Sequence, residues 1–252
     1  MDRHVSRPTI QLGALCAFLL LPVGAQASLA RKAAGAGNMG DSGAFTADTA
    51  VELEQEEDGR VLVLEAALQV QLLGRLQFLA EAVLLERESF VGEETAAGIG
   101  DTDLILSWLM LTDEAWAPSL VLATEVKLPT ASGDLGTGKP DYSALLVVEK
   151  EIGELELSIE LELATFGSAP GEELKDQFIH TFGAEYSVSD LLAVYVEIFG
   201  NSAPSALESR TDAATLGVEL DFSRSDAFAP YLSLEIDTEK VAVVRAGIEW
   251  VW

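Results

Sequence analysis

The chain has 252 residues, and its 42 Asp and Glu residues outnumber 15 Lys and Arg, which gives a formal net charge of −27 at pH 7. A chain this acidic repels the phosphate backbone, so nucleic acid is excluded as a partner. Nevertheless, 49% of the residues are hydrophobic and the mean hydropathy is +0.25. One fold must therefore hold a large apolar surface together with many carboxylates.

The first 27 residues have the pattern of a secretory signal peptide. Two arginines precede an apolar run, and Ala25-Gln26-Ala27 matches a cleavage site of small residues. The only cysteine, Cys16, lies in this segment, so the mature chain has no disulfide although it leaves the cytoplasm. We expect residues 1–27 to be removed. Residues 28–48 are rich in Gly and Ala and show no period, and we expect a flexible leader or a short plug.

Most of the remaining chain alternates between apolar and polar residues with a period of two. The clearest case is 155–163, LELSIELEL, which is long enough for a tilted strand to cross a bilayer. No apolar run after the signal segment reaches the roughly eighteen residues of a transmembrane helix. The alternation predicts strands near 49–57, 60–72, 76–87, 100–111, 119–129, 141–150, 154–166, 177–187, 190–200, 211–222, 229–237 and 240–252.

The connections between these strands differ in length. Four are long and polar, at 88–99, 130–140, 167–176 and 201–210, and short turns lie between them. Long loops at one end and short turns at the other are typical of outer-membrane barrels. We therefore predict an all-β fold, a closed antiparallel transmembrane barrel of about twelve strands that forms a single domain over 49–252.

A soluble barrel or sandwich would also have one apolar face per strand. The number of strands favours the membrane barrel, as does the final residue, Trp252, which resembles the C-terminal signal of outer-membrane barrels. Aromatic residues also occur at strand ends, as membrane-interface girdles require. We assign Phe90, Phe166 and Phe199 to a girdle at the long-loop end, and Trp116, Tyr186, Phe228, Trp250 and Trp252 to one at the short-turn end.

Residues 133–139, GDLGTGK, have the glycine spacing and the lysine of a phosphate-binding loop. Such a loop needs Ser or Thr after the lysine to hold Mg²⁺, and a helix behind it. Here Pro140 follows, and the next segment alternates as a strand does. We interpret this stretch as a loop between two strands and not as a nucleotide site.

The region from Gly98 to Leu163 resembles the outer-membrane transporter family named after the meta-cleavage pathway of phenol degradation. The family pattern is matched at Gly98-Ile99-Gly100-Asp101, at Lys127 to Thr130, at Leu135 to Gly138 and at Asp141. This resemblance implies a barrel with a transport function. The chain has fewer aromatic and Arg residues than is usual for such barrels, and more Glu. We therefore do not transfer an aromatic substrate from the family to this chain.

The sequence offers little basis for catalysis. His180 is the only histidine after the signal segment, and alternation places it on the same face as Phe178 and Phe182, toward lipid or the interface. The His, Cys and acidic residues after the signal segment do not support a Ser-His dyad, a His/Cys metal cluster or a calcium-binding loop. We expect no enzyme activity, no cofactor and no bound metal.

If the apolar faces contact lipid, the carboxylates face the barrel interior. Like charges at close range require water and counterions, so we expect a wet lumen that favours cations. An acidic, salt-adapted proteome would produce the same composition without any role in selectivity. The lumen residues that we expect to set selectivity are Glu125, Lys127, Glu156, Glu160, Glu162, Glu219, Asp221, Arg245 and Glu249.

These observations favour a passive channel or uptake protein for small solutes in the bacterial outer membrane. Its expected partners are membrane lipid, a small-molecule solute and the barrel-assembly machinery, which would recognise the C-terminal strand. Two alternatives stay open. One is a structural or adhesive barrel with a filled interior, and the other is a soluble secreted barrel that binds a ligand.

Overall fold

The computed structural model describes residues 44–92, 94–133, 135–167, 176–202, 211–222, 228–238 and 241–252. The predicted signal peptide and residues 28–43 of the predicted leader lie outside these ranges. None of the described residues belongs to a helix long and apolar enough to cross a membrane. The strands are β1 (Phe45–Gln55), β2 (Gly59–Leu73), β3 (Leu76–Phe90), β4 (Ala96–Gly98), β5 (Thr102–Leu111), β6 (Ser119–Leu128), β7 (Asp141–Ile152), β8 (Leu155–Thr165), β9 (Gln177–Ser189), β10 (Leu192–Asn201), β11 (Thr211–Asp221), β12 (Phe228–Asp237) and β13 (Ala242–Val251).

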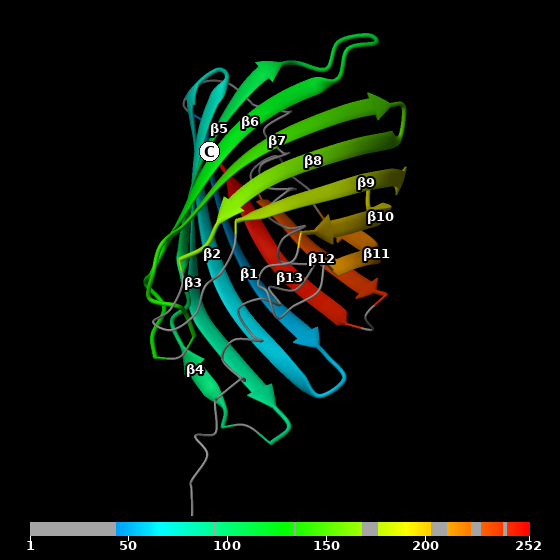
Figure 1. Cartoon of the computed structure of the whole chain (residues 1–252). Coiled ribbons are helices and arrows are strands. Elements are labelled where there is room, and N and C mark those ends of the chain that lie inside the picture. The colour runs from blue at the N-terminus through cyan, green and yellow to red at the C-terminus, as the bar shows by residue number, and fades with distance from the viewer. Residues whose placement is uncertain are drawn as a thin grey trace, which may run out of the picture.

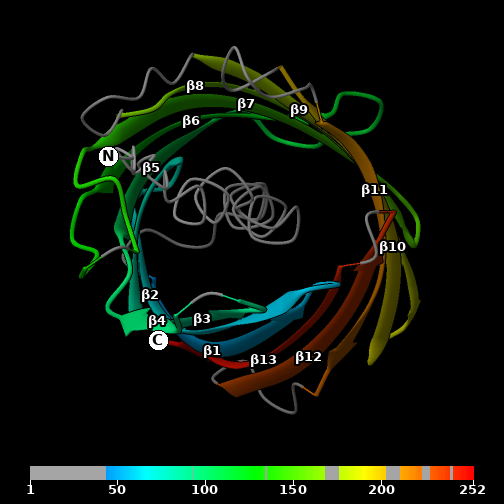
Figure 2. The same cartoon turned by 60° about the horizontal axis from the view of Figure 1, so that its bottom comes forward.

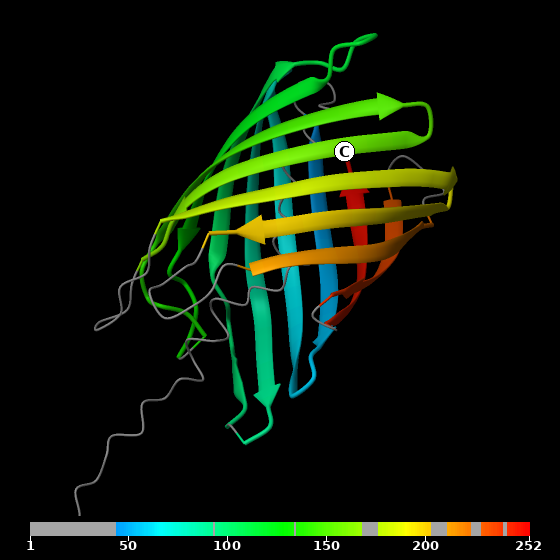
Figure 3. The same cartoon turned by 45° about the vertical axis from the view of Figure 1, so that its right-hand side comes forward.

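The long strands form one closed antiparallel ring (Figure 1). Consecutive strands pair around the ring, and β1 closes it by pairing with β13 from Thr46↔Val251 to Gln55↔Ala242. The strands slant around the barrel wall (Figure 3), as closure of a sheet into a barrel requires. The prediction of a closed antiparallel barrel of about twelve strands is confirmed.

The short β4 was not predicted from the sequence. It pairs with the far end of β3, at Glu86 to Glu88, whereas β5 pairs only with the first half of β3, from Leu76 to Ala82. A bulge in the β2–β3 ladder between Leu64 and Glu65 separates these two halves. A bulge places two consecutive residues against one partner residue and therefore breaks the alternation on which the prediction depended.

The outer surface of the barrel carries a belt of exposed apolar side chains. On β8, Ile159 and Leu163 are exposed while Glu160 is buried. Such a belt is unfavourable in water and suits the hydrocarbon interior of a bilayer. The alternative of a soluble barrel with its apolar faces inside is therefore wrong. Exposed members from other strands are Leu53, Leu68, Leu106, Leu122, Phe182, Ile198, Leu216, Leu234 and Val244.

Part of the inner wall is apolar as well. A buried cluster lies on the inner faces of β2, β3, β5, β6 and β7, so these strands have apolar residues on both faces. The sequence predicted carboxylates for the interior and did not single out this apolar part of the wall. The cluster, here called the apolar wall, consists of Ala67, Leu79, Ile105, Leu109, Val121, Ala123, Leu145 and Val147.

The predicted girdle at the long-loop end needs correction. Phe199 is buried, and Phe166 packs against its cluster with Ala164, Ile179 and Ala213. Both rings therefore point inward and fill the barrel interior. Among the described residues at this end, Tyr142 and Phe178 are exposed aromatics. At the short-turn end, Trp116, Tyr186, Phe228 and Trp252 are exposed as predicted.

The short turn 112–118 is tied to the end of β7. The side chain of Lys150 donates to the Asp113 carboxylate, and the backbone N–H of Glu151 donates to its other oxygen at 2.9 Å. The hydrogen bond from Lys150, with that from Glu151, holds the pKa of the Asp113 carboxyl below its usual range. The turn is thereby held at the short-turn rim.

The unequal ends of the barrel predict its orientation. We expect the loop 129–140 to face the cell exterior and the turn 190–191 to face the periplasm, because long loops of outer-membrane barrels are extracellular. A membrane-impermeant maleimide should label Lys139→Cys on intact cells, and Asp190→Cys only after the cells are opened. Both positions are exposed, and the chain after residue 27 contains no cysteine. The reverse labelling pattern would contradict this orientation.

Candidate functional site: the lumen

An acidic recess lies in the inner wall formed by β7, β8, β9 and β10. Gly183 gives it depth, because a Cβ at this position would overlap the Ser158 hydroxyl. Tyr195 borders the recess, and its ring covers Gly217 on the neighbouring strand. The side chains that line the recess include five carboxylates, those of Glu149, Glu156, Glu160, Glu185 and Glu197.

The pairing of the strands brings these carboxylates close together. Glu156 and Glu185 are direct cross-strand partners, an arrangement that is destabilising for two like charges unless something screens them. The Ser119 hydroxyl donates to Glu149 at 3.3 Å. No Lys or Arg is among the described residues that line the recess. The charged side chains of the described lining are therefore all acidic.

The opposite wall of the barrel carries an arginine whose charge is neutralised by neighbouring carboxylates. Arg245 on β13 forms ion pairs with Glu52 on β1, at 3.4 Å, and with Glu65 on β2. Its Nε donates to the Tyr231 hydroxyl at 3.3 Å, and that hydroxyl donates to Asp48 at 3.3 Å. β13 and β1 lie half-way round the ring from β7 and β8 (Figure 2). Arg245 thus lies across the lumen from the acidic recess. Because it is paired with carboxylates, it adds no net positive charge to the lumen.

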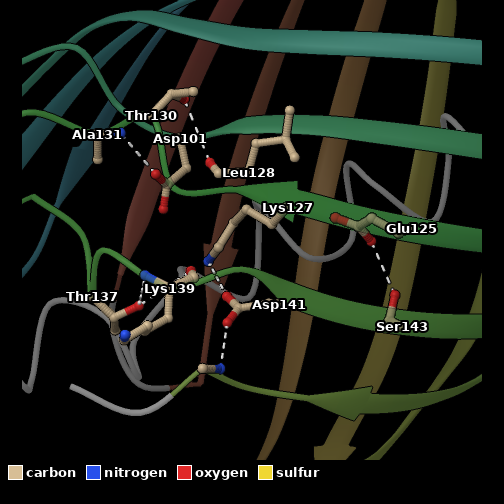
Figure 4. Close-up of polar contacts among 11 residues, drawn as sticks. Asp101, Glu125, Lys127, Leu128, Thr130, Ala131, Thr137, Lys139, Asp141 and Ser143 are labelled. Atoms are coloured by element: carbon tan, nitrogen blue, oxygen red, sulfur yellow. Dashed lines mark hydrogen bonds and ion pairs between the residues drawn. The ribbon is translucent and has the colours of Figure 1, made fainter. Parts of the chain in front are cut away.

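A second cation lies at the long-loop end of the lumen (Figure 4). Lys127 on β6 forms an ion pair with Asp141 on β7 at 2.7 Å. Asp141 also accepts a hydrogen bond from the backbone of Gly167 at 2.7 Å. The next inward-facing pair on the same two strands is Glu125 and Ser143. The Ser143 hydroxyl donates to Glu125 at 3.1 Å. Lys127 therefore neutralises a neighbouring carboxylate at this end.

The nine predicted lumen residues lie on inward-facing positions, but they do not form one cluster. Glu156 and Glu160 line the acidic recess, and Glu162 follows them on β8. The group Glu219, Asp221 and Glu249 lies toward the short-turn ends of β11 and β13. The residues predicted to set selectivity did not include Glu149, Glu185 and Glu197, which the structure places in the recess. The alternation of the sequence places these three residues inward, but it does not distinguish them from the other inward-facing glutamates.

Two of the motifs that carry the family resemblance, Gly98 to Asp101 and Lys127 to Thr130, contact each other at the long-loop end. Figure 4 shows Asp101 and Thr130 at this place. The Asp101 carboxylate accepts a hydrogen bond from the backbone of Ala131 at 2.8 Å. The Thr130 hydroxyl donates to the carbonyl of Gly100 at 3.2 Å, and the Ser132 hydroxyl accepts from the backbone N–H of Ile99 at 2.8 Å. A Cβ at Gly98 would overlap Ser132. These contacts, here called the loop clasp, hold the loop 129–140 against the segment before β5.

The loop clasp leads us to predict how stably the loop 129–140 is held. Asp101→Ala removes the acceptor for Ala131, and a hydrogen bond to a charged group is worth about 1.5–3 kcal/mol. We expect the loop to open more often and proteinase K to cleave within 129–140 faster in the folded barrel. Asp113→Ala, which alters a turn at the other end, should leave cleavage of this loop unchanged. Equal cleavage of the Asp101→Ala variant and the parent would contradict the clasp.

His180 lies on the outward face of β9, where the alternation predicted it. Its ring stands between those of Phe178 and Phe182, with centroids 5.9 Å from each, and both phenylalanines are exposed. Within the described ranges, no group of three or more His, Cys, Asp or Glu side chains is placed to hold a metal ion.

Comparison with known proteins identifies the fold. No protein-family model and no curated protein matches the chain. Among solved structures it is similar to the COG4313 outer membrane channel from Pseudomonas putida F1, with TM-score 0.67 and 13% identity over 84% of this chain and 96% of that one. It is also similar to the KdgM porin in complex with disordered oligogalacturonate, with TM-score 0.55 and 10% identity over 81% and 98%.

A third similar structure has a different role. It is the translocator domain of the autotransporter NalP from Neisseria meningitidis, with TM-score 0.50 and 14% identity over 95% of this chain and 99% of that one. At these identities the likenesses show the fold alone. Together with the apolar outer belt, they define the chain as a β-barrel of the bacterial outer membrane. Because channels and a translocator share this fold, the function must be argued from the lumen.

Proposed function

We propose that the protein is a passive outer-membrane channel for small solutes and that its lumen favours cations. The observation that carries the proposal is the recess of five carboxylates without a cationic side chain among its described lining residues. Both lumen cations described above, Arg245 and Lys127, are paired with carboxylates. Among the charged side chains of the described lining, a permeating ion therefore meets carboxylates only. Rings and patches of Asp and Glu favour cation passage in channels.

The similar structures support a channel but not the choice of solute. The KdgM porin is described in complex with an oligogalacturonate, which carries carboxylates of its own. The acidic recess of the present chain would repel such a polyanion. We therefore infer a neutral or cationic small solute, and we do not carry the oligogalacturonate over to this protein.

We also infer kinship with the meta-pathway outer-membrane transporters. The supporting observation is that two of the matched segments, Gly98 to Asp101 and Lys127 to Thr130, are joined by the hydrogen bond from the Thr130 hydroxyl to the Gly100 carbonyl. A set of motifs that folds into one contact cluster is more specific than scattered matches. The kinship extends to the barrel and its transport role.

Conductance of the purified, refolded protein in planar bilayers tests the channel proposal. We expect discrete current steps and, under a KCl gradient, a reversal potential of the sign that cation preference requires. A correctly folded barrel without steps would instead favour the structural or adhesive barrel with a filled interior. Steps with anion preference would contradict the role assigned to the acidic recess.

A further inference from the structure

The carboxylates of the acidic recess lie on different sides of a glycine. Gly183 pairs with Ser158 on β8 and with Glu197 on β10. Along β8, Glu156 and Glu160 lie on either side of Ser158, and all three line the recess. These two glutamates are about 13 Å apart along the strand, at about 3.3 Å per residue. The recess therefore offers two separated acidic positions with a stretch of wall between them that lacks a side chain at Gly183.

This arrangement does not suit direct coordination of a metal ion. Among the residues that the structure describes, no group of three or more His, Cys, Asp or Glu side chains is placed to hold one. Carboxylates that do not converge on one point suit a ligand whose donors are themselves separated. Each ionised carboxylate accepts hydrogen bonds at both oxygens, and an ammonium group supplies N–H donors. The pattern favours an organic cation with more than one ammonium group.

Thr215 on β11 brings a buried hydroxyl to the edge of the recess. It is the direct cross-strand partner of Glu197, and it points into the lumen because its neighbour Leu216 is exposed on the lipid side. Thr215 is only 3% exposed, and its Oγ1 has no hydrogen-bond partner among the described residues. A buried polar group without a partner is unfavourable. A ligand with an N–H group beside Glu197 would satisfy this hydroxyl.

Glu235 on β12 supplies a second buried acceptor on the same side of the recess. It pairs with Gly217, and the ring of Tyr195, which lines the recess, lies over this glycine. The Oε2 atom of Glu235 is buried and has no hydrogen-bond partner among the described residues. An ionised carboxylate can only accept hydrogen bonds, so its partner must be a donor. Thr215 and Glu235 thus both favour a ligand that carries N–H groups.

We propose that the acidic recess binds aliphatic diamines and polyamines, with one ammonium group between Glu156 and Glu185. A second ammonium group lies at Glu160, and the methylene chain between the two passes over Gly183. The inference rests on the proposed cation-favouring channel and names the class of solute that its recess takes. A bound amine also relieves the repulsion between the cross-strand partners Glu156 and Glu185.

Calorimetric titration of the detergent-refolded barrel with putrescine, a four-carbon diamine, tests this proposal. We expect saturable binding at low salt. Butanediol, which has the same chain without charge, should not bind. Butylamine, which has one ammonium group, should bind more than about tenfold more weakly, because a hydrogen bond to a charged group contributes at least such a factor. Absence of saturable putrescine binding, or equal affinities for putrescine and butylamine, would overturn the proposal.

Variants locate the binding site on the wall. Glu156→Gln with Glu185→Gln should weaken putrescine binding more than about tenfold, and Thr215→Val, which keeps the side-chain shape, should weaken it about threefold to tenfold. The matched control is Glu57→Gln with Glu154→Gln, which changes the net charge equally at exposed positions outside the strands. It should leave the affinity unchanged. An equal loss in this control would show that overall charge attracts the amine, and it would overturn the proposed site.

The binding result is separable from the conductance experiment, because calorimetry measures no current and the KCl solutions contain no amine. Heat-modifiability on gels confirms that each barrel is folded. A barrel that conducts cations but does not bind putrescine would overturn the amine site and leave the channel proposal standing. A barrel that binds putrescine without current steps would contradict the channel proposal and support the amine site.

Discussion

Replacing Glu156, Glu160 and Glu185 together by Gln should sharply reduce the cation preference of the pore. Perfect selectivity corresponds to about 59 mV for a tenfold gradient of a monovalent salt. We expect the reversal potential of the variant to move toward zero by more than about 10 mV on this scale. The barrel should fold normally, because the Glu156 and Glu185 side chains are direct cross-strand partners and their repulsion is removed.

The effect should depend on ionic strength. At about 0.1 M salt, charges more than about 10 Å apart are largely screened, so the shift should be larger at low salt. The matched control is the triple variant Glu57→Gln, Glu94→Gln and Glu154→Gln, which changes the net charge equally at exposed positions outside the strands. It should leave the reversal potential almost unchanged. If the lumen variant behaves as the parent does at low salt, the acidity reflects salt adaptation and not selectivity.

Replacing Leu161 by Arg should produce the largest loss of folding stability among single substitutions on β8. Leu161 lies near the middle of the strand, on the lipid side, between the cross-strand partners Leu146 and His180. Arg at the bilayer midplane of a transmembrane barrel costs about 2–4 kcal/mol. Glu160→Gln, on the neighbouring inward position, should change the unfolding free energy little, because its side chain lines the lumen and does not face lipid.

A denaturant titration of the barrel in lipid vesicles, followed by tryptophan fluorescence, measures both changes. Leu163→Arg provides a depth control on the same face, because Leu163 lies closer to the long-loop interface and the cost falls to about 0–1 kcal/mol there. The order of costs should be Leu161→Arg, then Leu163→Arg, then Glu160→Gln. A larger cost for Glu160→Gln than for Leu161→Arg would contradict the assignment of the faces.

Much of the barrel could be predicted from the sequence because strand alternation is a local property. The pattern of 154–166 predicted a strand that the structure has at Leu155–Thr165, and its two faces are those that the alternation indicated. The same holds for β13, where Val244 is exposed and Arg245 is buried. In each case neighbouring side chains must point to opposite faces, whatever the rest of the chain does. The number of strands and the lipid-facing belt followed from the same rule.

Alternation failed where one residue breaks the period or where both faces are apolar. The bulge between Leu64 and Glu65 and the short β4 leave no regular signal. Phe166 and Phe199 were assigned to a girdle because they lie at strand ends, but their parity directs them inward, where they pack together. On β5, β6 and β7 both faces carry apolar residues, so the alternation could not indicate that the apolar wall faces inward.

The sequence by itself determined a membrane barrel with carboxylates on its inner face, since period-two alternation sets what faces lipid. Only the tertiary structure decided which of those carboxylates meet. Glu156 and Glu185 become neighbours through the register of β8 and β9, and Arg245 reaches Glu52 and Glu65 because β13 closes onto β1. Closure also places this compensated arginine across the lumen from the acidic recess. Register and closure join residues distant in the chain, so a local pattern carries no information about them.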